Sequence, residues 1–305
     1  MDLIQKELLE AVAGLHRIPA GAFNIRSNGK SVERQTTEHI DIVSKADGSG
    51  IDIIVKPGAK GESVHIPVII SQSGIIEAVY NDFHIGENAD VTIIAGCGIH
   101  NGGTKDSQHD GIHRFFLAPG ARVRYIEKHY GRGDGLGQRI MNPQTIIHIA
   151  ENGYMEMETA QIKGVDSTER ITTADLAAGA TLVVTERLMT HGCQTAKSTF
   201  EVALNGDGSG THIISRSVAK EHSKQLFISR VNGNAPCSGH TECDAIIMDE
   251  ASVHAVPEIA ANCTDAALLH EAAIGKIAGE QIIKLMSLGL TEQQAEEQII
   301  NGFLK

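Results

Sequence analysis

The sequence predicts a mainly β protein, a parallel β-helix of stacked coils with short helical segments at both ends. Strand-corner-strand segments recur every 27 to 32 residues through the middle of the chain. Aromatic residues make up only 4% of the chain and Trp is absent, so Val, Ile, Leu and Ala must fill the core. Aliphatic side chains suit thin, closely stacked strands. Apolar residues at helical spacing occur only near the two termini.

Each copy of the repeat has an alternating strand, a short corner with Gly or Asn, a small residue and a second alternating strand. The small residues are Ala59, Ala89, Ala121, Gly153, Ala180, Gly208 and, in a seventh copy, Ala251. Gly and Asn accept the left-handed backbone of a sharp corner, and a small residue lets the next coil stack closely. The repeat lacks the helix of a leucine-rich repeat and the aromatic signature of a propeller blade. The alternative is an irregular β-sandwich with coincidental spacing.

The two ends of the chain differ from this core. Helical spacing is present at Leu3, Ile4, Leu8, Leu9 and Val12. The strand pattern stops near residue 264, where "GEQIIKLMSLG" and "TEQQAEEQIINGF" read as two helices. Thr291 and Gln294 form a capping box at the start of the second helix. We therefore expect an N-terminal helical segment at 1–37, a β-helix core at 38–262 and a C-terminal helical unit at 263–305.

Composition excludes several classes of function. The chain has 26 Lys and Arg against 38 Asp and Glu, a net charge of -12, which argues against nucleic acid or an anionic membrane as partner. No apolar stretch is long enough for a membrane helix, and the acidic N-terminus is unlike a signal peptide. Five scattered cysteines predict free thiols in a reducing cytoplasm. The P-loop, H-E-x-x-H and nucleophile-elbow motifs are absent, so we expect a protein that is not an enzyme.

Most of the fifteen histidines alternate with apolar residues in strands, where a structural role is expected. His100, His109 and His113 lie closer together, and His-rich segments can bind metal. However, neither Cys nor Glu stands at a supporting interval in that segment, so we do not place the site there.

The segment "CSGHTEC" sets Cys237, His240 and Cys243 at C-x2-H-x2-C spacing. A zinc knuckle needs four ligands, and this segment supplies three. His270 and Glu271 follow 27 and 28 residues after Cys243, just before the expected helical unit. Thiolate and imidazole favour zinc, copper or iron–sulfur chemistry over magnesium or calcium. Spacing alone leaves open whether all three residues or only Cys243 carry the chemistry.

The C-terminal stretches "ECDAIIM", "VPEIAA", "LLHEAAIGKI" and "GLTEQQAEEQIINGF" together resemble the C-terminal block of the SufB/SufD family of iron–sulfur cluster assembly scaffolds. "SVERQTTEHIDI", near residues 31–42, is similar to the family's entry segment. The resemblance implies a right-handed parallel β-helix and a non-catalytic scaffold that builds a labile iron–sulfur cluster. Mixed Cys, His and carboxylate ligation should hold such a cluster less tightly than four thiolates would.

Residue by residue, the resemblance implies that Cys243 is the essential cysteine and that Glu271 and His270 are further ligands. Cys237 and His240 match no invariant position and become mere neighbours. The implied partners are a separate ABC-type ATPase on the C-terminal helices and, upstream, a cysteine desulfurase or sulfur carrier. Because one chain carries residues that two specialised subunits divide, we expect a homodimer through the β-helix, with the cluster at its junction.

Two other functions remain open. The first is a structural zinc protein that uses Cys237, His240 and Cys243. The second is a carbohydrate-active enzyme on a β-helix, which the sparse aromatic residues and the net negative charge disfavour.

Overall fold

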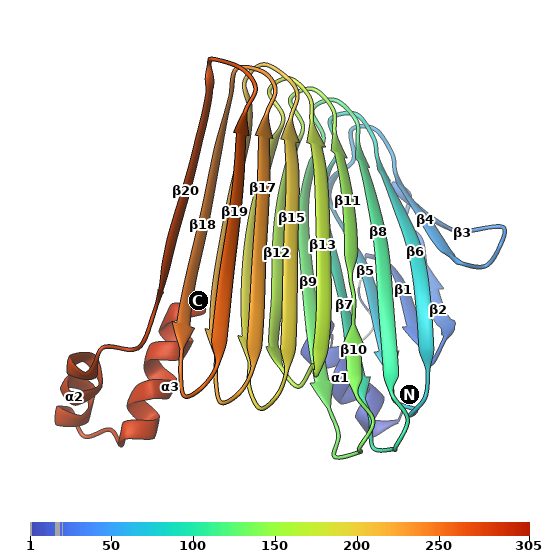
Figure 1. Ribbon diagram of the computed structural model, residues 1–305. Helices are drawn as coiled ribbons and strands as arrows, with labels where there is room; N and C mark the ends of the chain where they lie inside the picture. The colour runs from blue at the N-terminus through green and yellow to red at the C-terminus, as the bar shows by residue number, and fades with distance from the viewer. Residues whose placement is uncertain (1, 16–18, 20) are drawn as a thin grey trace.

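The chain folds into a β-solenoid of about eight turns, which confirms the predicted fold class. The computed structural model describes residues 2–15, 19 and 21–305. Figure 1 shows two sheets that face one another along the coil, with helices near its lower edge. From the fourth strand onward, successive strands of the chain alternate between the sheets, except that two short strands share one position of the second sheet. Each of these turns therefore contributes one strand position to each sheet.

The first sheet has the order β2 (Lys30–Gln35), β1 (Ala22–Ser27), β5 (Lys60–Ile70), β7 (Asp90–His100), β9 (Arg122–Arg132), β12 (Tyr154–Lys163), β14 (Thr181–Thr190), β16 (Ser209–Ala219), β18 (Cys237–Ile247) and β20 (Ala266–Gly275). The second has the order β19 (Ser252–Ala261), β17 (Lys224–Gly233), β15 (Thr195–Leu204), β13 (Ser167–Leu176), β10 (Arg139–Met141), β8 (Ser107–Leu117), β6 (Ile76–Ile85), β4 (Gly50–Val55) and β3 (Ile40–Ser44), with β11 (Gln144–Ile149) continuing the β10 position. The helices are α1 (Leu3–Ala13), α2 (Gly279–Ser287) and α3 (Glu292–Phe303).

The corners have the geometry that the repeat predicts. Asn88 and Asn152 adopt positive φ of 55° and 57° at two of them. Ala89 and Ala121, which follow such corners, are completely buried. The Asp90 backbone N–H donates to the Ala59 carbonyl of the preceding turn over 2.7 Å, which continues the parallel ladder through the corner. Small residues at these points therefore let consecutive turns stack at strand spacing.

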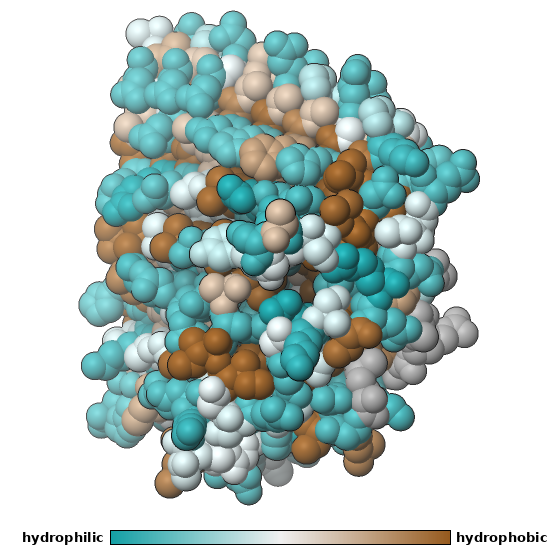
Figure 2. Space-filling view, turned by 90° about the vertical axis from the view of Figure 1, so that its right-hand side faces the viewer, coloured by the Kyte–Doolittle hydropathy of each residue, from teal (hydrophilic) through white to brown (hydrophobic). Residues whose placement is uncertain are grey.

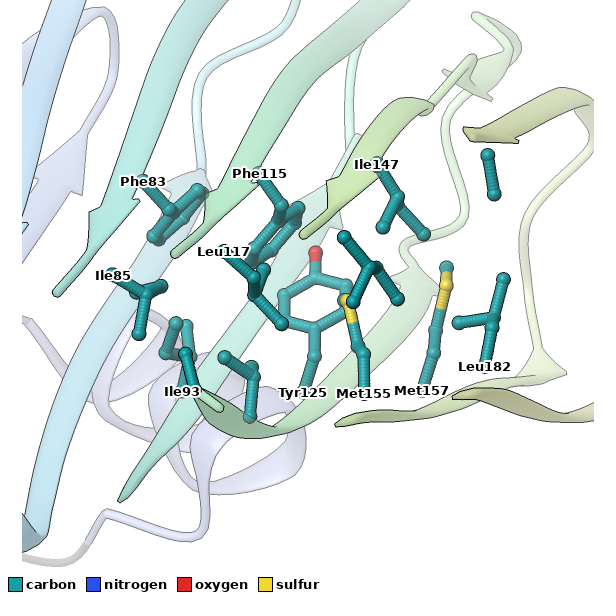
Figure 3. Close-up of a cluster of buried hydrophobic side chains, with 14 of the residues drawn as sticks. Phe83, Ile85, Ile93, Phe115, Leu117, Tyr125, Ile147, Met155, Met157 and Leu182 are labelled. Carbon is teal, nitrogen blue, oxygen red and sulfur yellow. The ribbon is translucent and has the colours of Figure 1, made fainter. Parts of the chain in front are cut away.

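The space between the two sheets is filled mainly by aliphatic side chains, as the composition predicts. Figure 3 shows Phe83 and Phe115 stacked between Ile85, Leu117 and the methionines of β12. The Phe83 and Phe115 rings are 4.3 Å apart and nearly parallel. Tyr125 points into the same layer and carries its hydroxyl toward the second sheet (Figure 3).

Helix α1 packs on the outside of the first sheet at β7. A Cβ on Gly96 would lie 3.0 Å from Val12 Cβ, and one on Gly98 would lie 3.1 Å from Leu8 Cβ. Both glycines point outward and leave room for the helix, while Cys97 between them points inward. The N-terminal end of the coil, seen in Figure 2, is largely hydrophilic with separate apolar patches.

The two C-terminal helices differ in how they contact the coil. Ile300 and Leu304, at the end of α3, pack on Val218 of β16. Helix α2 buries none of its residues, and Ile283 and Met286 are exposed. Among the described helices, none has both the length and the apolarity needed to cross a bilayer.

The coil extends further at both ends than the expected core of 38–262. Within the expected helical segment 1–37, of which residues 1, 16–18 and 20 lie outside the described part, β1 and β2 form an antiparallel hairpin. Its turn, Asn28-Gly29, has positive φ at both residues and is a strong hairpin signal. Within the expected unit 263–305, residues 266–275 form β20. No further turn of the described coil covers the final turn, so its sequence does not show the usual alternation of apolar and polar residues.

Candidate functional site at the open end of the coil

Strands β18 and β20 are hydrogen-bonded neighbours, and they carry the three residues that the sequence singles out. In their register, Thr241 lies opposite His270 and Cys243 lies opposite Ala272. Opposed residues point to the same face of a sheet. Thr241 and Cys243 are both buried, so His270 points inward and lies diagonally across from Cys243. Glu271 points outward, away from both.

Cys243 is part of the main hydrophobic core and is 1% exposed. Burial raises the pKa of its thiol to about 12, and the charges of Glu186 and Asp244 add to this effect. The thiol is therefore protonated at neutral pH in this state of the chain. Because the thiolate is the metal ligand and the nucleophile, Cys243 needs a bound metal or a local opening of the last turn to react.

Cys243 ends a buried chain of polar groups that runs along the coil. Ser215, opposite Cys243 on β16, donates to Glu186 Oε2 over 2.8 Å, and Ser198 donates to Glu186 Oε1 over 2.6 Å. Arg170 Nε lies 3.8 Å from Glu186 Oε1, and its Nη1 donates to Glu127 Oε2 over 2.5 Å. The guanidinium of Arg170 thus compensates two buried carboxylates, one on each side.

Both ring nitrogens of His270 are buried and have no hydrogen-bond partner. Burial, assisted by the nearby His240, lowers the pKa of His270, so its imidazole is neutral at pH 7. A buried polar atom without a partner costs roughly 1–3 kcal/mol. A neutral imidazole carries a lone pair on one ring nitrogen. Because neither nitrogen of His270 has a hydrogen-bond partner, that lone pair is available to bind a metal ion.

The outer face carries a second, more exposed group around Glu271. His240 Nε2 lies 3.4 Å from Glu271 Oε2, at ion-pair distance but without hydrogen-bond geometry. The His240 ring stacks on that of His212, with centroids 4.8 Å apart. Burial and the like charge of Asp244 raise the pKa of Glu242, which lies opposite Glu271. His240, which the sequence reduces to a neighbour, thus contacts one of the three predicted residues.

The interpretation of "CSGHTEC" as one zinc knuckle is wrong. These residues lie along the single extended strand β18, where successive side chains alternate between faces. Cys237 and Cys243 point into the core and His240 points outward. A single ion cannot be bound from both faces of a sheet. Cys237 is packed in the same core as Cys243, on the opposite face of β18 from His240.

The last turn of the coil is open. Strands β19 and β20 each end their sheet, so one edge of each is without a strand neighbour. Figure 1 shows this end on the left, with only the two C-terminal helices below it. Val256, Ile259 and Leu269 expose large apolar side chains there. The Cys243 and His270 pair lies one strand or less from this open edge.

Comparison with known proteins shows the family of the chain. Residues 69–303 match the family model of the SUF system FeS cluster assembly, SufBD core domain. The chain is 30% identical over 281 residues to an iron–sulfur cluster assembly SufBD family protein of Archaeoglobus fulgidus, covering 90% of this chain and 73% of that protein.

Two further relatives carry the same family description. One, from Methanothermobacter thermautotrophicus, is 28% identical over 86% of this chain, which spans 63% of that protein's length. The other, from Methanocaldococcus jannaschii, is 27% identical over 98% of this chain and 96% of that protein. The chain therefore belongs to the SufBD family of iron–sulfur cluster assembly proteins.

Proposed function

We propose that the chain is a scaffold on which a labile iron–sulfur cluster is built, with Cys243 as thiolate ligand and sulfur acceptor. His270 supplies a further ligand from the same inner face. Glu271, which points outward in the closed coil, supplies one once the last turn has opened and brought its side chain to the cluster. The single observation that carries the proposal is the register of β18 and β20, which places a thiol and an unpartnered imidazole diagonally beside the open edge. The iron and sulfide are the cargo of this site.

The cluster lies at the junction of two copies of the chain. The free edges of β19 and β20 offer unpaired backbone groups to which a second coil can add strands. Val256 and Ile259 supply apolar surface that such a partner would cover. Separation of the two copies, or movement of the last turn, exposes Cys243 and allows its thiol to release its proton to solvent as the metal binds the sulfur.

A separate ABC-type ATPase binds the C-terminal helices, and a cysteine desulfurase or sulfur carrier delivers sulfur. Helix α2 supports the first assignment because it buries no residue and exposes Ile283 and Met286. A thiolate accepts sulfane sulfur as a persulfide, which is the form in which such donors deliver it. Five free thiols fit a reducing cytoplasm.

Anaerobic reconstitution with Fe²⁺ and sulfide tests the scaffold assignment. Wild-type chain should develop a labile visible chromophore, and Cys243→Ser should abolish it. Cys237→Ser is the matched control, because Cys237 is on the same strand, points to the same face and packs in the same core. If the two variants lose the chromophore equally, Cys243 has no special role.

Two binding measurements test the partners. Val256→Glu should turn a dimer into a monomer in light scattering, and Ile283→Glu should abolish co-purification with an ABC-type ATPase. Leu136→Glu, at an even more exposed apolar residue of a distant loop, should change neither. If Val256→Glu remains a dimer and Ile283→Glu still co-purifies with the ATPase, both assigned interfaces are wrong.

The geometry does not favour the carbohydrate-active alternative. Sugar-binding grooves present free faces of aromatic rings. The exposed rings of His84, Phe116 and His148 instead stack on one another, with centroids 5.2 and 5.4 Å apart. Both faces of the Phe116 ring are therefore occupied by the two imidazoles.

A further inference from the structure

A pocket lies at the N-terminal end of the coil, between the hairpin of β1 and β2 and the hairpin of β3 and β4, on the right in Figure 1. Its volume is about 290 Å³, roughly that of ten water molecules and near the lower end of the range for small-molecule pockets. Neither Asp nor Glu is among its lining residues, although the chain has a net charge of -12. The pocket is therefore an exception to the acidic character of the chain.

One wall of the pocket is apolar. Ile51 of β4, Ile66 and Val68 of β5 and Val79 of β6 line this wall, and none of them is more than 6% exposed. A ligand that covers such a wall with carbon atoms is stabilised, because apolar surface is removed from water. The wall therefore favours an organic ligand over an inorganic ion.

Asn24 of β1 presents a free donor in the polar part of the lining. Its Oδ1 accepts from Ser31 Oγ over 2.5 Å and from Arg34 Nε over 3.0 Å. Because Arg34 can only donate, the amide oxygen must be on this side. The amide nitrogen of Asn24 has no acceptor among the described residues, although the side chain is only 6% exposed. A nearly buried donor without an acceptor costs free energy that a bound anion would recover.

Two arginines of the lining also have N–H groups that no described residue accepts. Arg34 donates through Nε to Asn24 and through Nη1 to Ser44 Oγ over 3.0 Å, which leaves Nη2 free. Arg26 donates through Nε to Glu77 and through Nη2 to a backbone carbonyl, both over 2.9 Å, which leaves Nη1 free. Both guanidinium groups are already held in place, so they lose little conformational entropy when a ligand binds.

The charge of the lining is positive. Glu77 neutralises Arg26, but Arg34 pairs with no carboxylate of the described residues. Lys30, which is exposed at the start of β2, also forms no ion pair with them. A guanidinium with free N–H groups matches the oxygens of a carboxylate or a phosphate. The free donors and the uncompensated charge together make the pocket complementary to an anion.

A larger cavity, of about 700 Å³, lies among the loops before β10, β13 and β15 and is less suited to an anion. Its lining includes Asp166, which accepts from Arg139 Nε and Nη2 over 2.7 and 2.8 Å. Arg132, in the same lining, is paired with Glu7 of α1. Both arginines of that cavity are already neutralised by carboxylates.

We propose that the pocket between the two hairpins binds a small organic anion. The carboxylate or phosphate group of this anion accepts hydrogen bonds from Asn24 Nδ2, Arg26 Nη1 and Arg34 Nη2, and its short carbon chain lies on the apolar wall. Lys30 adds positive charge at the rim. The pocket is at the other end of the coil from β18 and β20, so the proposal is independent of cluster assembly.

Isothermal titration calorimetry in phosphate-free buffer, with butyrate and with monobutyl phosphate, tests the proposal. The neutral control is 1-butanol, which has the same carbon chain without the charge. At least one of the two anions should bind at a single site per chain, and 1-butanol should give no saturable heat. The anion that binds more tightly identifies the group that the donors recognise. The proposal is overturned if neither anion binds, or if 1-butanol binds equally well.

Two variants test the position of the site. Asn24→Asp keeps the oxygen that accepts from Arg34 but turns the free donor into a carboxylate, so it should bind the anion more than about tenfold more weakly. Arg34→Gln removes the uncompensated charge and should also weaken binding more than about tenfold. Arg124→Gln, on the exposed face of β9, lowers the net charge by the same amount and should bind as the wild type does.

Circular dichroism establishes that each variant is folded. The proposal is overturned if either folded pocket variant binds the anion as tightly as the wild type, or if Arg124→Gln weakens binding as much as they do. Wild-type crystals soaked with the tighter-binding anion decide the matter even if both pocket variants fail to fold. Density for the anion beside Asn24 and Arg34 supports the site, and its absence overturns it.

Discussion

The coil combines a thiol, imidazoles and carboxylates at two places, and the surroundings of the two places differ. Around Cys97 there are further turns on both sides, and α1 covers the outer face of β7. The Nδ1 atoms of His109 and His113 are tied to hydrogen-bond partners. Around Cys243 the coil ends, and both nitrogens of the neighbouring His270 lack partners.

The thiol and imidazole groups near Cys97 and near Cys243 therefore lie in two different environments. A site that is enclosed and oriented by outer hydrogen bonds favours retention of an ion. A site at the end of a stack, where the last strands have a free edge, can open at low cost in free energy, because local stability falls where few groups are packed. The closed region is thus suited to keeping its side chains in place, and the open region to the release of the cargo that we propose for it.

Arg170 connects the two regions, and its replacement should have the largest effect. Arg170→Met leaves the buried carboxylates of Glu127 and Glu186 without their cation. Breaking a buried ion pair from one side costs about 3–5 kcal/mol. Urea denaturation should show that loss in the free energy of unfolding. Arg230→Met, which removes an exposed arginine that also bridges two carboxylates, should leave the transition almost unchanged. Equal effects would mean that the interior chain of polar groups does not hold the regions together.

The closed region should also make stability depend on pH. Burial, the main cause, lowers the pKa of His113 from 6.5 to about 4. The unfolded chain therefore binds a proton between pH 6.5 and 4 that the folded chain does not. Stability falls as pH falls through this window, by about 3 kcal/mol in metal-free protein.

His113→Gln should flatten this part of the stability curve, as measured by denaturation at a series of pH values. Replacement of His148, which is exposed on the outer face, should leave the pH dependence in place. An unchanged slope in His113→Gln would show that the buried imidazole does not titrate in this range.

The coil itself could be predicted from the sequence because its signals are local. Alternation, a corner with Asn or Gly and a small residue after it all fall within one repeat, as at Asn88 and Ala89. The ends could not be predicted as well. Strand β20 lacks the burial that produces alternation, and the Asn28-Gly29 hairpin lay inside a segment interpreted as helical.

The sequence names candidate residues for the site but does not give the faces on which they lie. Cys243 and Glu271 are one repeat apart, which suggests that they share a face. The register of β18 and β20 instead places Ala272 opposite Cys243, and a shift of one residue moves a side chain to the other face. The interior cluster of Cys97 and the buried histidines was not predicted, because Cys97 joins the histidines only through stacking across turns. The signal for it was present in the glycines that flank Cys97, which mark it as inward-facing.

The contrast between closed and open regions can be measured on the thiols themselves. Cys97 and Cys243 are both buried, and burial raises the pKa of each. Because the last turn opens more readily, Cys243 should be alkylated at least about tenfold faster than Cys97 in native metal-free protein, the ratio that a 1.4 kcal/mol difference in opening free energy gives. Mass spectrometry of alkylated peptides measures both rates, with exposed Cys193 as the internal reference. Equal rates for Cys97 and Cys243 would mean that the end of the coil is no looser than its middle.

The smallest expected effect concerns how the interior controls the open site. The negative charge of Glu186 raises the pKa of Cys243, so its removal should lower that pKa and increase the fraction of thiolate. Glu186→Gln keeps an oxygen to accept from Ser198 or Ser215 but removes the charge. At a fixed pH near 8, alkylation of Cys243 should accelerate roughly fivefold, since such a charge contributes on the order of 1 kcal/mol at a protein's effective dielectric. The alkylation rate of Cys243 should therefore change less when groups around Glu186 are replaced than when the pH is changed.

Ser198→Ala, which leaves the charge of Glu186 in place, is the control for altered packing. If it accelerates the reaction as much as Glu186→Gln does, access to the thiol and not its charge environment determines reactivity at the open end.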